Sequence, residues 1–167
     1  MAKKRLDEVL KNHSEWLMTR FAMQKHGECA DLRGADLCDA DLRDADLRGA
    51  EYNEYTAFFA IQCPEYGSFI GWKRADKYIV KIQITESALR SSATSRKCRC
   101  SEALVLAIEK FDGTDSGLSE IRSNYDSGFI YRVGEIVKVS NFCEDRWTEC
   151  TTGIHFFITR QEAINYI

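Results

Sequence analysis

The stretch that decides the fold reads Ala30-Asp31-Leu32-Arg33-Gly34, Ala35-Asp36-Leu37-Cys38-Asp39, Ala40-Asp41-Leu42-Arg43-Asp44 and Ala45-Asp46-Leu47-Arg48-Gly49. A decayed fifth copy begins at Ala50. A period of five residues fits neither an α-helix nor a simple strand, whose side chains repeat every 3.6 and every two residues. It fits a square coil in which each repeat forms one side and every fifth residue points inward.

The interior of this coil is predicted to consist of leucines with alanines beside them, namely Leu32, Leu37, Leu42 and Leu47 with Ala30, Ala35, Ala40 and Ala45. The second inward residue must be as small as alanine, because each repeat places two side chains in the narrow interior of the coil. Four copies make about one turn. Because solenoid units bury their core by stacking on neighbours, we expect the segments before and after the repeats to cap them.

This repeat resembles the pentapeptide-repeat family, which implies a short right-handed β-solenoid coil. Long members of that family can resemble duplex DNA in shape and charge. One coil is too short for such mimicry, and it carries three arginines against six aspartates. We therefore interpret the repeat as a structural cap or as a surface for homo-oligomerisation.

The segments on either side of the repeat give an α+β fold class. Residues 3 to 26 are predicted to form an amphipathic helix, because apolar residues recur at helical spacing up to Phe21, and Gly27 is a plausible stop. After Tyr52, strands are predicted at 68–73, 77–84, 103–111 (a helix remains an alternative there), 129–139 with a turn at Gly134, and 153–159. A loop is expected within 85–101, a turn at 112–117 and a helix at 160–166 with Thr159 as its N-cap. The predicted domains are a helix cap (1–28), the repeat coil (29–55) and a mainly β domain (56–167).

Composition limits the classes of function. The chain has 167 residues, of which 44% are hydrophobic and 29% charged, and a formal net charge of −3. No apolar run is long enough to span a membrane, and no basic block alternates with aromatics as in a single-strand nucleic-acid groove. We therefore expect a cytoplasmic protein that binds neither membrane nor nucleic acid. Its seven cysteines are expected to be reduced thiols.

Three stretches after the repeat resemble an uncharacterised domain that often follows pentapeptide repeats in phage and bacterial proteins. They are Cys63-Pro64-Glu65-Tyr66-Gly67-Ser68-Phe69-Ile70-Gly71-Trp72-Lys73, Arg90-Ser91-Ser92-Ala93-Thr94-Ser95-Arg96-Lys97-Cys98-Arg99-Cys100 and Asp145-Arg146-Trp147-Thr148-Glu149-Cys150-Thr151-Thr152-Gly153-Ile154-His155-Phe156-Phe157. The helical run from His13 to Leu17 is also usual there. The resemblance implies a phage or prophage origin, in which evasion of host defences is a common role, and it implies no established activity.

Residues 90–97 combine four hydroxyls with three cations, a set that suits a phosphate or a carboxylate. A solvated surface loop is the plainer interpretation, and the glycines of a phosphate-binding loop are missing. The aromatic residues further along the chain are enough for a core, although some of them could line a ligand pocket.

Cysteine and histidine side chains of the C-terminal domain suggest two further kinds of site, a zinc site and a catalytic pair. A zinc site could use four of Cys98, Cys100, Cys143, Cys150 and His155, but the spacing matches no standard zinc finger, so no metal and no cofactor is predicted. Cys150 and His155 could instead act as nucleophile and base, with Glu149 or Asp145 orienting the imidazole. No nucleophile-elbow motif supports that reading.

The sequence thus favours a non-catalytic binding protein whose C-terminal domain captures a small anionic or nucleotide-like ligand or a host protein. The predicted contacts are Arg90, Ser92, Ser95, Arg96, Arg146 and His155. The alternatives are a Cys/His-dependent enzyme acting on a nucleotide, and a structural oligomerisation module.

Overall fold

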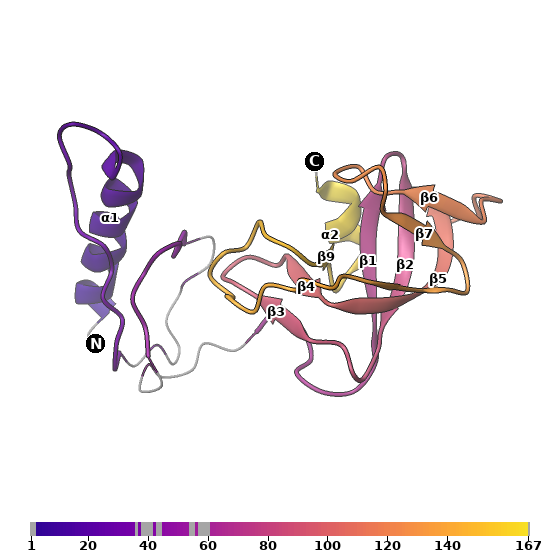
Figure 1. Cartoon of the computed structure of the whole chain (residues 1–167), viewed down its shortest axis with the longest axis horizontal. Coiled ribbons are helices and arrows are strands. Elements are labelled where there is room, and N and C mark those ends of the chain that lie inside the picture. The colour runs from indigo at the N-terminus through magenta and orange to yellow at the C-terminus, as the bar shows by residue number, and fades with distance from the viewer. Residues whose placement is uncertain are drawn as a thin grey trace. The chain divides into compact units, whose positions relative to one another are not determined.

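The computed structural model describes residues 3–35, 37, 42, 45–53, 56 and 61–166. The chain divides into two compact units, the first comprising Met1–Ala60 and Trp147–Glu149, and the second Ile61–Arg146 and Cys150–Ile167. Figure 1 shows helix α1 in the first unit, and strands β1 to β9 with helix α2 in the second. The prediction of one N-terminal helix followed by many strands is therefore confirmed.

Helix α1 spans Lys3–Thr19 and ends well before residue 26, where the periodicity placed its end. The backbone then returns along the helix, and the amide of His26 donates to the Thr19 hydroxyl at 2.9 Å. Gly27, at φ 73°, lies so close to α1 that a Cβ there would meet helix backbone atoms. The prediction of a longer helix was wrong, because Phe21 is 90% exposed and packs against no core.

The repeat leucines and several of the repeat alanines, including Ala30 and Ala35, are buried. Leu32, Leu37, Leu42 and Leu47 are each at most 2% exposed, as the period of five predicts. The alanine three residues after a leucine donates its amide to the leucine carbonyl, as seen at Ala35, Ala45 and Ala50, each at 3.0 Å. A parallel bridge joins Asp31 to Glu51, which are four repeats apart. The predicted position of Ala40 lies outside the described residues.

The largest sheet of the second unit is antiparallel with the strand order β1-β2-β5-β8. Its strands are β1 (Phe69–Ala75), β2 (Tyr78–Ile84), β5 (Glu102–Lys110) and β8 (Ile136–Lys138). The predicted pair of strands is confirmed, and the segment left open between strand and helix is strand β5. The register pairs Lys73 with Val80, which places Lys73 on the same face of β1 as Gly71 and Ala75.

Two smaller sheets complete this unit. One has the order β3-β4-β9, from β3 (Arg90–Ser92), β4 (Cys98–Cys100) and β9 (Ile154–Phe156). The other pairs β6 (Glu120–Arg122) with β7 (Ile130–Arg132). The expected loop within 85–101 is present at residues 93–97, and strands β3 and β4 on either side of it were not predicted. Pairing with β9 makes strand β4 from residues that are not typical strand formers. Gly134, at φ 86°, forms the predicted turn between β7 and β8.

The core of the second unit lies between these strands. Its fully buried side chains include Ala75 from β1, Val80, Ile82 and Ile84 from β2, Cys98 and Cys100 from β4, Ala103 and Val105 from β5, and Ile154 and Phe156 from β9. Burial of these side chains is the main contribution to the stability of the unit.

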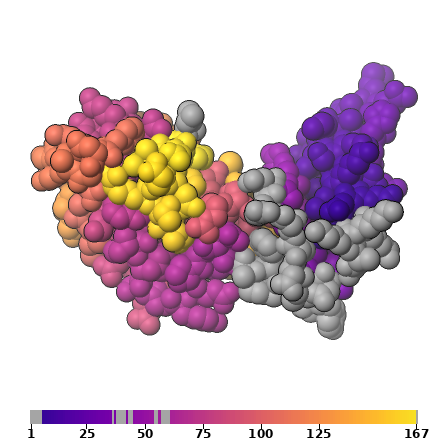
Figure 2. All heavy atoms as spheres, turned by 180° about the vertical axis from the view of Figure 1, so that it is seen from behind, coloured from indigo at the N-terminus to yellow at the C-terminus, as the bar shows by residue number. Residues whose placement is uncertain are grey.

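A second, smaller cluster lies under helix α2 (Arg160–Asn165), where Ala163 packs against Ile79 and Phe157. Thr159 caps the helix, since its hydroxyl accepts from the Glu162 amide while the Glu162 carboxylate accepts from the Thr159 amide. The predicted N-cap is therefore confirmed. Figure 2 shows α2, in yellow, at the surface of the second unit.

Gly71 tests the packing of the sheet against the core. A Cβ at this position would lie 2.7 Å from Cδ2 of Phe156 and 2.8 Å from Cδ1 of Ile84. We expect Gly71→Ala to lower the free energy of unfolding by about 1–3 kcal/mol, the usual cost of overpacking. Urea denaturation followed by circular dichroism measures this change.

Gly128→Ala is the matched control, because a Cβ there meets only the Asp126 carboxylate, at 3.2 Å. Its effect should stay within about 0.5 kcal/mol. Equal losses in the two variants would contradict the close contact between β1 and β9.

Candidate functional site

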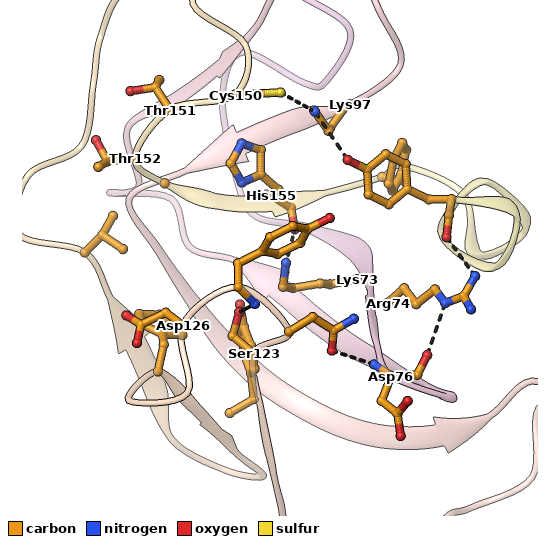
Figure 3. Close-up of a pocket in the computed structure, with 18 of the residues that line it drawn as sticks. Lys73, Arg74, Asp76, Lys97, Ser123, Asp126, Cys150, Thr151, Thr152 and His155 are labelled. Atoms are coloured by element: carbon orange, nitrogen blue, oxygen red, sulfur yellow. Dashed lines mark hydrogen bonds between the residues drawn. The ribbon is translucent and has the colours of Figure 1, made fainter.

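A pocket of about 810 Å³ opens in the second unit (Figure 3). This volume is within the range of about 300–1,000 Å³ that is typical of small-molecule sites. Its lining combines basic groups (Lys73, Arg74, Lys97 and His155), rings (Tyr125, Phe129, Tyr131, Phe157 and Tyr166), polar side chains (Ser123, Asn124, Asn141, Thr151 and Thr152) and two acids (Asp76 and Asp126). Strands β1 and β9 with the segments beside them, and residues 123–131, supply most of these residues.

Lys73 is the most deeply buried basic group of the pocket. It comes from the core-facing side of β1 and is only 7% exposed. Within the described part of the chain, its amine has one hydrogen-bond acceptor, the backbone carbonyl of His155, at a long 3.3 Å. An ammonium has three donors, so two of them have no acceptor among the described residues. Figure 3 shows Lys73 reaching toward His155.

The surroundings of Lys73 disfavour its charged form. Burial lowers the pKa of Lys73 to about 8, and the nearby Lys97 ammonium adds to the effect, against an opposing contribution from Cys100. The amine nitrogen lies 5.9 Å from the centroid of the Tyr131 ring. Burial raises the pKa values of Tyr131 and Cys100, so both stay neutral near pH 7. Lys73 therefore sits among neutral groups, with a second cation nearby.

Lys97 lies on another wall of the pocket and is 8% exposed. Its ammonium donates to the Cys150 sulfur at 3.2 Å and to the Tyr166 hydroxyl at 3.5 Å, contacts that are drawn in Figure 3. A hydrogen bond between the hydroxyls of Tyr125 and Tyr166 raises the pKa of Tyr125. A connected series of donors and acceptors thus runs from Cys150 to Tyr125.

Arg99 fixes the backbone of the segment around Cys150, which forms one wall of the pocket. Its guanidinium is 1% exposed and donates to the backbone carbonyls of Cys143 (2.8 Å), Thr152 (3.0 Å) and Asp145 (2.8 Å). A buried guanidinium satisfied by carbonyl oxygens fixes the backbone on which those oxygens lie. Strand β4 thereby holds the segment that brings Thr152 to the pocket.

The two acidic residues of the pocket belong to turns. The Asp126 carboxylate accepts from the amide of Gly128 at 2.8 Å. The backbone amide of Asp76, in the β1–β2 turn, donates to the side-chain oxygen of Asn124 at 2.7 Å. These bonds hold residues 123–126 against the end of β1, and the four basic residues outnumber the two acids in the lining.

Arg90, a predicted ligand contact, is bound to the backbone. Its guanidinium donates to the carbonyl oxygens of Gly67 and Thr85, each at 2.8 Å, and further bonds reach Pro64, Glu86 and Ala88. It also lies 5.3 Å from the centroid of the Phe69 ring. This arrangement organises the chain around β3.

Four of the other predicted contacts are bonded to neighbouring parts of the second unit. The Ser92 hydroxyl accepts from the Gln62 amide at 2.7 Å, while Arg146 donates to the Ser92 carbonyl at 3.0 Å, so these two residues lie together. The Ser95 hydroxyl accepts from the Lys97 amide at 3.1 Å. Arg96 pairs with Glu162 at 2.7 Å. Of the six predicted contacts, His155 is the one that lines the pocket.

The alternating faces of β4 and β9 separate the cysteines and histidine of the zinc alternative. Cys98 and Cys100 are buried in the core, whereas His155 pairs with Arg99 on the other face. Within the ranges that the structure describes, no three His, Cys, Asp or Glu side chains are grouped as metal ligands. Cys150 and His155, the nucleophile and base of the catalytic alternative, do line one pocket, and it is Lys97 that contacts the Cys150 thiol.

Sequence reasoning missed Lys73, Lys97 and Tyr166 as site residues. A lysine within an apolar strand is a weak signal by itself, and only the β1–β2 register shows that Lys73 faces inward. Lys97 lies inside the cationic segment 90–97, but the predicted contacts of that segment are its arginines and serines. The contact of Lys97 with Cys150 joins residues 53 positions apart, which no local pattern reveals.

The buried guanidinium of Arg99 gives a stability prediction. Arg99→Met leaves three carbonyl oxygens without their donor, so we expect unfolding to become easier by about 3 kcal/mol or more. The amides of residues 150–153 should also exchange faster with deuterium, which mass spectrometry detects.

Arg132→Met is the control, because Arg132 forms an exposed ion pair with Glu120. Such pairs contribute about 1 kcal/mol or less. Unchanged exchange at 150–153 in Arg99→Met would show that Arg99 does not support this wall.

Comparisons with known proteins complete the description of the chain. No helix among the described residues is both long and apolar enough to cross a membrane. No curated protein and no solved structure matches the chain. A family model described as pentapeptide repeats (8 copies) matches residues 28–51, and one described as a family of unknown function (DUF5758) matches residues 59–163, more than half of the chain. The chain therefore belongs to the DUF5758 family of unknown function, and pentapeptide repeats precede its family domain.

Proposed function

We propose that the second unit is a binding domain that captures a small anionic ligand with a flat ring, of nucleotide-like chemistry, in the pocket around Lys73 and Lys97. The observation that carries the proposal is the convergence of two buried lysine amines and His155 on one pocket. Buried cations are costly unless an anion accompanies them, and a ligand can provide that anion.

The distribution of charge supports an anion. The whole chain is acidic, with a net charge of −3, yet basic residues outnumber acidic ones in this pocket. The Asp126 carboxylate is engaged by the Gly128 amide. Lys73 forms no ion pair with any described carboxylate, so an incoming phosphate or carboxylate meets donors that are already in place.

The rings of the pocket support a flat ligand. Tyr125, which is 77% exposed, and Tyr166 are joined by their hydroxyls, while Phe129 packs edge-on against Tyr131 at 5.2 Å between centroids. Aromatic faces stack on bases and similar rings, and nearby hydroxyl and amide groups such as those of Ser123 and Asn141 supply directed hydrogen bonds. The combination suits a nucleotide better than a simple inorganic anion.

A Cys150-dependent enzyme acting on a nucleotide is a second candidate. Its support is that Cys150 and His155 line the same pocket and that an ammonium contacts the Cys150 sulfur. A Cys150→Ser protein that retains full turnover of any nucleotide found to be a substrate would remove this candidate.

For the repeat segment we propose one right-handed coil with a structural role, either as a cap or as a surface for homo-oligomerisation. The support is the burial of its leucines and the parallel bridge between Asp31 and Glu51, one four-repeat turn apart. We also propose a phage origin and a role against host defences. Capture of a nucleotide-like signal is consistent with both.

Native mass spectrometry of the freshly purified protein tests the binding proposal. We expect an excess of several hundred daltons over the denatured mass, which identifies the class of compound. Lys97→Met removes a charged donor from the pocket and should lower ligand occupancy or affinity by about tenfold or more.

Arg96→Met is the matched control, because Arg96 pairs with Glu162 and lies outside the pocket lining. Circular dichroism checks that both variants fold. Loss of the ligand in Arg96→Met together with full retention in Lys97→Met would place the site at residues 90–96 instead. A co-purifying polypeptide without any small ligand would replace the proposal by a host-protein partner.

A further inference from the structure

We propose that Lys73 forms an imine with an aldehyde or ketone group of the ligand, so that the pocket binds an anionic carbonyl compound covalently and reversibly. The inference deepens the proposed function and rests on it, because the same pocket must first hold the anion.

The position of Lys73 supports this role. Its side chain starts from the core-facing side of β1, in register with Val80, and its amine lines the pocket. The hydrogen bond to the His155 carbonyl holds the amine nitrogen, and the amine has no other hydrogen-bond acceptor among the described residues. A nucleophile that is fixed in place reacts with a bound partner far faster than one in solution.

The electrostatic surroundings supply a neutral amine. Imine formation needs the unprotonated nitrogen, and the pKa of Lys73 is lowered to about 8 by burial and by the Lys97 charge. An ordinary lysine, with a pKa of about 10.4, is almost entirely protonated at neutral pH. Desolvation and a neighbouring cation are the two known means of activating a lysine for this chemistry.

The reaction balances without an oxidant or a reductant. The nitrogen lone pair of Lys73 adds to the carbonyl carbon and gives a carbinolamine. The carbinolamine oxygen then leaves as water, taking up the protons released from nitrogen, and a carbon–nitrogen double bond remains. Addition of water reverses the sequence and releases the ligand.

The other basic groups define the class of ligand. With Lys73 committed to the carbonyl, Lys97 and His155 remain to receive a phosphate or carboxylate. The tyrosine rings of the lining favour a flat body between the carbonyl and the anion. The expected class is a cyclic or aromatic aldehyde or ketone that carries one anionic group.

Pyridoxal 5′-phosphate, an aromatic aldehyde with a phosphate, is a suitable probe for the whole chain. After incubation with one equivalent, sodium borohydride should reduce the imine and leave one phosphopyridoxyl group per chain, located on Lys73 by peptide mapping. The initial rate of labelling should level off above about pH 8, whereas labelling of ordinary lysines continues to rise toward about pH 10.

Lys73→Arg keeps a positive charge but cannot form the imine, so it should lose this label, whereas Lys77→Arg, altered in the exposed turn after β1, should keep it. Circular dichroism checks the fold of each variant. Label spread over exposed lysines, or retained in full by Lys73→Arg, would overturn the inference.

Pyridoxine 5′-phosphate separates this inference from the proposed function, because it has the phosphate and the ring but no aldehyde. The analogue could bind in a way that depends on Lys97 while the aldehyde forms no imine. That result would support anion capture and exclude the imine. Failure of both compounds to bind would contradict the two proposals together.

Discussion

The Lys73 amine is buried and has no carboxylate partner among the described residues. The proposed chemistry of the second unit depends on this constraint. The β1–β2 register turns this lysine toward the core, where Val80, Ile82 and the other buried residues of β2 determine the packing. Moving a charge into such surroundings costs free energy, and a lowered pKa is the usual response. The protein therefore maintains an amine that is both protected from bulk water and open to one pocket.

Arginines and lysines have different tasks in this unit. Arg90 and Arg99 each donate several hydrogen bonds to backbone carbonyls and fix irregular segments, which suits a planar group with five donors. Lys73 and Lys97 line the pocket, where a compact ammonium or amine can meet a ligand. The three cations of the segment 90–97 thus differ in their surroundings: Arg90 and Arg96 are bound to other parts of the unit, whereas Lys97 lines the pocket.

The sequence predicted the features that local patterns determine. The period of five in the repeat requires inward leucines, and Leu32 and Leu42 are buried accordingly. Alternation predicted β1 and β2, and the Thr159 cap follows from residues adjacent in the chain. The end of α1 was misjudged because Phe21 fits a helical period without having a core to face.

The pocket could not be predicted in the same way, because it is made by contacts between distant segments. Lys97 meets Cys150 and Tyr166 only after β4 pairs with β9, and Lys73 meets His155 only after β1 and β9 come together. His155, one of the predicted contacts, lines the pocket from strand β9, and a strand at this place was predicted from the sequence. The predicted arginines lie outside the pocket lining. Their partners, which include backbone carbonyls for Arg90 and Arg146 and the Glu162 carboxylate for Arg96, could not be inferred from the sequence.

The most direct test of the account is a backbone nuclear magnetic resonance titration of the whole protein with adenosine 5′-monophosphate. The account predicts that shift changes concentrate on the amides of the pocket lining, including Lys73, Lys97, Ser123, Thr152 and His155. Changes confined to residues 90–96, or no changes at millimolar ligand, would contradict the assignment of function to this pocket.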